Sequence, residues 1–366
     1  MPIYVNISGV WKTASDILCN IGGVWKTVNA IYTNINDVWK RMDFNIIKKY
    51  TSSITNLSVA RYNLKSASVS NYILFAGGND GGGSVTTVDA YNTSLTRSNP
   101  TALSTGRDSF ASASIGTSYA LFAGGNPYAP LSSVDAYNTS LTRSNPTALT
   151  VARGWFAGAS LSTTHALFAG GYNGSNGVNT VDAYNTSLTR SNPTVLSNNK
   201  TNLAGGSVGN YALFAGGYSG GFSTIVEAYN TSLTKSTPTA LSIGRENLTS
   251  GSVGNYVLFV GGYNGSGFSN VIDAYNTSLT RSIPTALSFN ANHIASASLI
   301  TTHVLFSCGF SNVVNAYDTN LTRTTPESLN ESKSYAIGGS VGNYALFAGG
   351  YVGSNSSATV EAYEFI

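Results

Sequence analysis

Short apolar segments ending in paired glycines recur every 41 to 47 residues from Phe44 onward. The first reads YILFAGG and ends at Gly77-Gly78, and later copies read YALFAGG, HALFAGG, YVLFVGG and HVLFSCG. A second marker, VDAY or a close variant, follows each segment. Its tyrosines are Tyr91, Tyr137, Tyr184, Tyr229, Tyr275, Tyr317 and Tyr363. Because each marker occurs seven times, the sequence predicts seven repeat units.

Within each unit, apolar and polar residues alternate over four short segments. In the first unit these are residues 64–69, 72–76, 87–91 and about 95–103. Four strands per repeat at this period is typical of a β-propeller blade. The seventh unit stops after its third strand, at AYEFI, and a spare strand-like stretch, residues 44–54, precedes the first unit. We therefore predict an all-β fold in which residues 44–366 form a seven-bladed propeller closed by its N-terminal strand.

The first 43 residues carry a different repeat. VNISGVWK, CNIGGVWK and TNINDVWK place Trp11, Trp25 and Trp39 exactly fourteen residues apart, each after a short strand and a two-residue turn. The turns Ser8-Gly9, Gly22-Gly23 and Asn36-Asp37 suit β-hairpins. Three hairpins are too small to bury three tryptophans alone. We expect residues 1–43 to form a separate hairpin domain that anchors the protein to a partner or to copies of itself, as in a homo-oligomer.

Composition narrows the functional classes. Charged residues make up only 10% of the chain and the net charge is +3, which is too little for a nucleic-acid-binding surface. No apolar run is long enough to cross a membrane, and the first residues do not resemble a signal peptide. The two cysteines, Cys19 and Cys308, form no ligand cluster. We expect no nucleic acid partner, no membrane insertion, no metal and no cofactor.

Two charged positions repeat from unit to unit. A base precedes the first strand at Arg61, Arg107, Arg153, Lys200, Arg245 and Lys333, and an acid opens the third strand at Asp89, Asp135, Asp182, Glu227, Asp273 and Glu361. The sixth unit has Asn292 for the base and Asn315 for the acid. This joint loss predicts an ion pair across each double glycine, because glycine leaves room for a long side chain. A ring of bases that binds anions at the channel mouth is the alternative.

A second basic series follows the turn between the third and fourth strands. Its members are Arg97, Arg143, Arg190, Lys235, Arg281 and Arg323. We interpret them as a solvated ring on the opposite rim.

Two resemblances follow from these motifs. Kelch repeats combine a base, a double glycine and a tyrosine, which in the second unit are Arg107, Gly124-Gly125 and Tyr137. The propeller resembles this family, although serine or threonine stands where kelch blades usually have tryptophan. The GVWK repeat is similar to short modules in structural proteins of bacteriophage tails. That resemblance implies a role in a virion.

The sequence offers little support for catalysis. Copper-containing kelch enzymes use two histidines and two tyrosines, but here His165 and His303 replace tyrosines that open strands, and His293 stands apart. The carboxylates outside the ion pairs form no recognisable pair for glycoside hydrolysis. Phosphate-binding and nucleophile-elbow motifs are absent as well. We predict that the protein is not an enzyme.

The loops between the second and third strands vary most between units, which is typical of a binding surface on a fixed scaffold. Aromatic and small polar residues dominate them, a combination that suits sugar rings. The candidate ligand-binding residues are Tyr128, Trp155, Tyr172, Tyr218, Phe222, Tyr263, Phe268, Phe310 and Tyr351. The alternative is that the aromatic residues after the double glycines pack between blades.

We therefore expect a non-enzymatic virion protein of a phage or prophage, of the tail-fibre or receptor-binding type. It would assemble in the bacterial cytoplasm, with residues 1–43 bound to other virion proteins or to itself and the propeller bound to a host-surface glycan or protein. A bacterial surface or secreted adhesin is the first alternative, and a kelch-type enzyme acting on carbohydrate is the second.

Overall fold

The computed structural model describes the backbone of six strands between residues 3 and 42, and residues 46–307 and 309–366 with their side chains. The chain divides into two compact units, residues 1–47 with Ile366, and residues 48–365. No helix that could span a membrane occurs in the described part of the chain.

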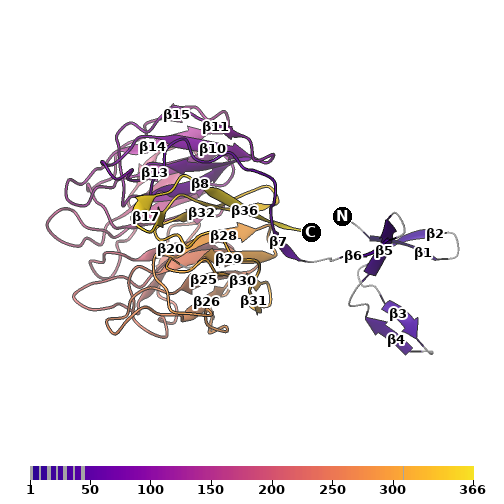
Figure 1. Ribbon diagram of the computed structural model, residues 1–366. Coiled ribbons are helices and arrows are strands. Elements are labelled where there is room, and N and C mark those ends of the chain that lie inside the picture. Colours follow the sequence, from indigo (N-terminus) through magenta and orange to yellow (C-terminus); the bar gives the residue numbers. More distant parts are fainter. Residues whose placement is uncertain are drawn as a thin grey trace. The chain divides into compact units, whose positions relative to one another are not determined.

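The larger unit is a β-propeller of seven four-stranded antiparallel blades, as predicted (Figure 1). The first strands of the blades are β8 (Lys65–Val69), β12 (Ala111–Ile115), β16 (Ala157–Leu161), β20 (Ala204–Val208), β24 (Thr249–Val253), β28 (Ala295–Leu299) and β32 (Ile337–Val341). The second are β9 (Tyr72–Ala76), β13 (Tyr119–Ala123), β17 (His165–Ala169), β21 (Tyr211–Ala215), β25 (Tyr256–Val260), β29 (His303–Ser307) and β33 (Tyr344–Ala348). The third are β10 (Val88–Asn92), β14 (Val134–Asn138), β18 (Val181–Asn185), β22 (Val226–Asn230), β26 (Ile272–Asn276), β30 (Val314–Asp318) and β36 (Val360–Phe365).

The outer strands are shorter than the sequence pattern suggests. They are β11 (Arg97–Ser98), β15 (Arg143–Ser144), β19 (Arg190–Ser191), β23 (Lys235–Ser236), β27 (Arg281–Ser282), β31 (Arg323–Thr324) and β7 (Ile47–Lys49). In the first blade, pairing stops where Asn99 turns its amide to the Asp89 carboxylate, with Nδ2 to Oδ1 at 2.8 Å. Pro100 follows and has no N–H to donate to a ladder. The rest of the predicted segment, up to the buried Leu103, is therefore loop.

The ring closes as the sequence predicts. β7 pairs with β36 and completes the seventh blade, so the indigo and yellow strands lie side by side in Figure 1. Lys49 fixes this strand: its Nζ lies 2.7 Å from the Glu361 carboxylate and donates to Ser328 O and Asn330 Oδ1 at 3.0 and 2.8 Å. The seventh blade also carries a small hairpin, β34 (Tyr351–Val352) with β35 (Asn355–Ser356), in the loop after its second strand.

Apolar side chains fill the space between consecutive blades. In each blade the phenylalanine of the second strand meets the tyrosine of the third edge to face, as Phe75 and Tyr91 do at 5.8 Å between ring centroids. The tyrosine hydroxyls cross to the preceding connecting segment, where each donates to a backbone carbonyl. The bonds run from Tyr91 to Thr55, Tyr137 to Thr101, Tyr184 to Thr147, Tyr229 to Thr194, Tyr275 to Thr239, Tyr317 to Thr285 and Tyr363 to Glu327. The repeated tyrosine thus joins neighbouring blades.

The first strands line a central channel of about 300 Å³ with small residues, mostly serine, glycine and alanine. Their serine hydroxyls donate to carbonyls of the neighbouring blade, for example Ser112 Oγ to Ser66 O at 2.6 Å and Ser298 Oγ to Ser252 O at 2.7 Å. The channel wall is therefore polar but already engaged in hydrogen bonds.

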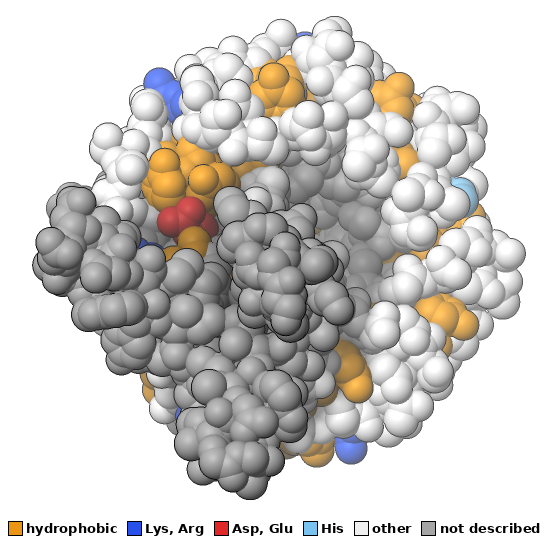
Figure 2. All heavy atoms as spheres, turned by 90° about the vertical axis from the view of Figure 1, so that its right-hand side faces the viewer, with side chains coloured by type: hydrophobic (Ala, Val, Ile, Leu, Met, Phe, Trp, Pro, Cys, Tyr) orange, Lys and Arg blue, Asp and Glu red, His pale blue; other side chains and the backbone are white. Residues whose placement is uncertain are grey.

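The face that bears the C-terminal end of β36 is shown in Figure 2. On its visible described part, charged side chains are few and scattered, and hydrophobic side chains form separate patches. The visible described part of this face presents no extended charged surface.

The smaller unit contains three two-stranded antiparallel hairpins: β1 (Ile3–Ile7) with β2 (Val10–Ala14), β3 (Leu18–Ile21) with β4 (Val24–Thr27), and β5 (Ile31–Ile35) with β6 (Val38–Met42). All three share one register, in which Trp11, Trp25 and Trp39 pair with the asparagine five residues earlier. The turn residues and the tryptophan side chains lie outside the described part.

Candidate functional site

Six blades contain a buried ion pair at the rim where the second strand ends and the third begins. In the second blade, Arg107 Nη2 lies 2.7 Å from Asp135 Oδ2, and both side chains are fully buried. The other pairs are Arg61–Asp89, Arg153–Asp182, Lys200–Glu227, Arg245–Asp273 and Lys333–Glu361, at 2.7 to 2.9 Å. Since these bases are buried and paired, they cannot form the anion-binding ring that was the alternative.

Burial lowers the pKa of Arg107, and the charge of Asp135 opposes that shift. For Glu227, burial favours the neutral acid, but the charge of Lys200 and hydrogen bonds from Lys200 and Ser197 outweigh it. The pKa of Glu227 therefore lies below its ordinary value. We interpret these buried pairs as part of the blade framework.

In the sixth blade, the residue that the sequence analysis assigned to the base position is wrong. Ala291, not Asn292, occupies the base position, because it stands four residues before β28, as Arg107 stands before β12. Its carbonyl also accepts the N–H of Gly262 at 2.9 Å, as the Arg153 carbonyl accepts that of Gly125. Asn315 replaces the acid and accepts the Ser288 N–H at 3.2 Å. This blade has therefore lost both charges together, as the sequence indicated.

The double glycines have a second role beyond leaving room for a base. A Cβ on Gly124 would come within 2.6 Å of the Arg153 carbonyl of the next blade. One on Gly125 would lie 2.8 Å from Asp108 O and 3.1 Å from Arg107 Cβ. Both glycines have positive φ, at 60° and 120°. The first glycine therefore fits the neighbouring blade, and the second fits the segment that carries the base.

The second basic series is not a solvated ring. Arg143 is only 24% exposed, its Nε lies 3.7 Å from Asp135 Oδ1, and its Nη1 donates to Ala102 O at 2.6 Å. Arg97, Arg190, Lys235 and Arg281 contact the acids of their own blades in the same way. The interpretation failed because the outer strand lies directly beside the acid, so the side chain reaches it along the blade edge.

Seven residues form a ring at the mouth of the channel, on the rim of the variable loops. Each stands two positions after the base and has left-handed backbone geometry, with φ between 50° and 54°. This mouth ring consists of Asn63, Ser109, Trp155, Asn202, Asn247, His293 and Tyr335. Backbone bonds join neighbours, such as Trp155 N to Ser109 O at 3.0 Å and Asn202 N to Trp155 O at 2.9 Å. Bulky residues rarely adopt this geometry, and such outliers cluster at functional sites.

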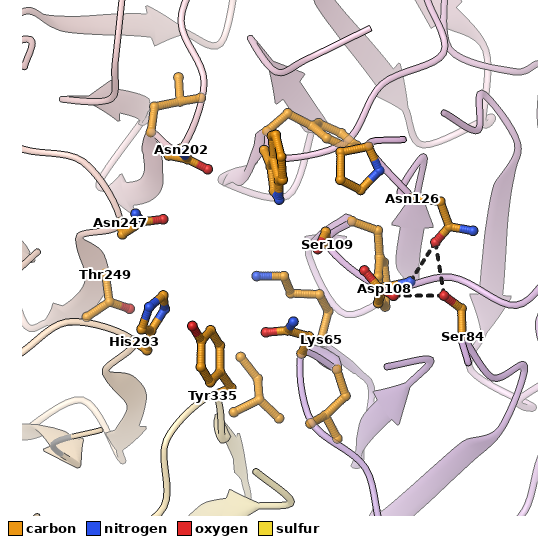
Figure 3. A pocket seen from close by; sticks show the side chains of 18 of the residues that line it. Lys65, Ser84, Asp108, Ser109, Asn126, Asn202, Asn247, Thr249, His293 and Tyr335 are labelled. Carbon is orange, nitrogen blue, oxygen red and sulfur yellow. Dashed lines mark hydrogen bonds between the residues drawn. The ribbon is translucent and has the colours of Figure 1, made fainter. Parts of the chain in front are cut away.

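The mouth ring surrounds a cavity of about 880 Å³ (Figure 3). Lys65, the first residue of β8, extends toward its middle, with His293 and Tyr335 on one side. The rings of His293 and Tyr335 stack at 3.9 Å between centroids. Burial and, secondly, the charge of Lys65 lower the pKa of His293 to about 4, so this imidazole is neutral at pH 7.

A groove of about 760 Å³ lies beside this cavity, between the third and fourth blades. Trp155 and Asn202 line both spaces. The remaining lining is aromatic or uncharged polar, with Tyr172, Tyr218 and the loop asparagines. No charged residue lines this groove among those described.

The predicted binding aromatics fall into groups on this rim. Tyr128 and Tyr172 flank Trp155, with ring centroids at 5.4 and 5.6 Å from it. A second series crosses three blades, in the order Tyr218, Phe222, Tyr263, Phe268 and Phe310, with successive centroids 5.5 to 6.3 Å apart. Tyr351 stacks on Tyr62 at 4.1 Å. These aromatics pack on one another between blades, and several stay open to solvent: Phe310 is 59% exposed and Tyr128 is 86% exposed.

Sequence reasoning selected Trp155 but missed the other members of the mouth ring and Lys65. Alignment of the seven units would have shown both, since Lys65 stands where other blades have Ala111, Ala157, Ala204 and Ala295. Of the histidines, His165 and His303 open second strands at the opposite rim, and only His293 reaches the cavity. Cys308 lies outside the described residues, among which no cluster of metal-binding side chains occurs.

Fold and site together define the class of protein: a seven-bladed β-propeller whose loop-bearing rim carries a polar, aromatic cavity. No protein-family model matches the sequence, and a search of curated proteins finds no match either.

Proposed function

We propose that this chain is a non-enzymatic binding protein that presents the loop-bearing rim of a kelch-like propeller to a glycan or protein on a host cell surface. The observation that carries the proposal is the groove lined by Trp155, Tyr172 and Tyr218 together with asparagine and serine side chains. Aromatic faces can cover the apolar side of a sugar ring, and amides and hydroxyls can bond its hydroxyl groups. The blade framework beneath these side chains hardly changes from unit to unit, so the variation is concentrated where a ligand would bind.

We further propose that the protein is a phage or prophage appendage, of the tail-fibre or receptor-binding type. The support is the GVWK repeat, with three hairpins in one register. Such a repeat offers equivalent sites for attachment to other virion proteins or to copies of itself. The kelch relationship has the support of the buried base, the double glycine and the joining tyrosine, which recur around the ring.

A glycan array with the full-length protein tests the binding function. The test variant carries Trp155→Asn and Tyr218→Ala, since asparagine already occupies the mouth ring in three other blades. The control is Ile283→Ala, which removes an apolar side chain that is 58% exposed beside the outer strand β27. We expect saturable binding that the double variant loses and the control keeps. Binding that survives in the double variant would contradict the groove as the site, and no binding to any glycan would contradict the glycan as ligand.

A further inference from the structure

Lys65 differs from every other base of the propeller. Among residues 46–307 and 309–366, the bases without an ion pair to another described residue are Lys48, Lys65 and Arg323. Arg323 donates to Ala286 O at 2.6 Å, and Lys48 is exposed on β7. Of the three, Lys65 alone lines the mouth cavity.

The fold does not require a lysine there. The equivalent residue is alanine in four other blades, threonine in the fifth and isoleucine in the seventh. Lys65 is partly buried, and an ammonium group that gives up part of its water without gaining an opposite charge costs free energy. Burial accordingly lowers the pKa of Lys65. An unneeded and costly charge at this point is explained if a ligand supplies the missing anion.

No group of the protein fills that role in the described cavity wall. Asp108 is the one carboxylate that lines it, and its Oδ2 accepts from Ser84 Oγ at 2.8 Å and from Asn79 Nδ2 at 3.4 Å. Figure 3 shows this carboxylate facing Ser84, away from the middle of the cavity. The neutral His293 adds no competing charge at pH 7.

Neutral donors stand around Lys65 as well. The side chains of Asn63 and Asn247 and the hydroxyl of Tyr335 make no hydrogen bond to any described residue, and all three line the cavity. Donors of this kind complete the coordination of a carboxylate or phosphate group whose charge is met by the ammonium. The aromatic rings beside them would cover the rest of a sugar.

We propose that the mouth cavity binds the anionic group of an acidic glycan, a sugar carboxylate or a sugar phosphate, with Lys65 as the residue that selects for its charge. This inference rests on the proposed glycan-binding function and names the class of ligand. It assigns recognition of the ligand's charge to the mouth cavity and stacking on its sugar rings to the neighbouring groove.

The test compares glucose, glucuronic acid, glucose 6-phosphate and inorganic phosphate as probes, by calorimetry and by the NMR titration of His293. The variant is Lys65→Ala, the residue that four other blades carry at this position, and the matched control is Lys48→Ala, which removes the same charge from an exposed site. We expect the wild type and the control to prefer an acidic probe to glucose. The Lys65→Ala variant should lose roughly tenfold to hundredfold in affinity for that probe, the range of one hydrogen bond to a charged group.

His293 provides a local readout. A bound anion should raise the pKa of His293, and so should Lys65→Ala, because each offsets or removes the neighbouring positive charge; Asp108, Tyr128 and Tyr335 are the other titratable groups of the wall. Preference for glucuronic acid or for the phosphates distinguishes the two anion sources. Acid binding that is equally strong in Lys65→Ala, or glycan-array binding restricted to neutral sugars, would overturn this inference and leave the proposed function standing. An empty array with no shift at His293 would overturn both.

Discussion

Removing one charge of a buried ion pair should lower the free energy of unfolding more than removing both charges does. Arg107 donates to Asp135 Oδ2, Ser133 O, Ser133 Oγ and Gly124 O at 2.7 to 3.1 Å, so Asp135→Asn leaves a buried guanidinium without a counter-charge. Removing one partner of such a pair costs about 3–5 kcal/mol. Arg107→Met should cost less, about 2–3 kcal/mol, since Asp135 keeps Arg143 at 3.7 Å and the Ser104 and Asn145 donors at 2.8 to 3.0 Å.

The double variant is the decisive measurement. It imitates the sixth blade, where Ala291 and Asn315 carry no charge. We expect it to lose about 2–3 kcal/mol, well short of the summed single losses, because no fully buried charge is left unpaired; Arg143 loses Asp135 but is 24% exposed to solvent. At about 2 °C per kcal/mol for a large domain, calorimetric melting should fall by about 6–10 °C for Asp135→Asn and about 4–6 °C for the double variant. A double variant that loses the full sum would refute the reasoning.

Three further predictions concern other parts of the propeller. Trp155→Asn should not lower the melting temperature although it removes a large side chain, because asparagine tolerates the left-handed backbone at φ 51°; a drop beyond about 4 °C would contradict the idea that this tryptophan serves binding. The pKa values of Glu227 and Glu361 lie below their ordinary value of 4.5, so the stability they contribute is complete above pH 4.5 and is lost as pH falls through the lowered values. Melting curves from pH 6 to 3 should show this loss, and a Lys200→Met, Glu227→Gln variant should show less of it. Lys49→Met should cost about 1–2 kcal/mol and speed hydrogen exchange at the Tyr50 amide, which donates to Ala362 O at 2.9 Å, while exchange in the fourth blade stays unchanged; uniform acceleration would argue against a local closure.

Repetition made the fold predictable. Strand pairs, the joining tyrosines and the ion pairs recur with the period of the chain, and the joint loss of charge in the sixth unit indicated which residues interact. The closing strand could be predicted because the last unit lacks a fourth strand and β7 supplies one. Side-chain reach was harder to predict: Arg143 contacts Asp135 because the outer strand lies beside the third, a relation that spacing alone does not give.

The site was only partly predictable. The variable aromatic loops stood out, since they interrupt an otherwise uniform repeat. The mouth ring did not stand out. The left-handed backbone at Trp155 or Tyr335 accompanies main-chain bonds between blades and has no signal in the local sequence. Lys65 was missed for a different reason: it is the first residue of β8, and only an alignment of the seven units shows that no other blade has a charged residue there.

The mouth ring also bears on how such a protein can change its target. Main-chain bonds between neighbours, such as Asn247 N to Asn202 O at 2.9 Å, help to hold its backbone in place, and the side chains differ from blade to blade on this shared backbone. Asparagine, serine, tryptophan, histidine and tyrosine all occupy equivalent places in this one molecule. If the proposed binding function holds, each blade therefore offers one position at which a single codon change would alter what the channel mouth recognises while the blade beneath stays the same. Seven such positions around one opening would let a lineage explore many surfaces while its scaffold stays the same.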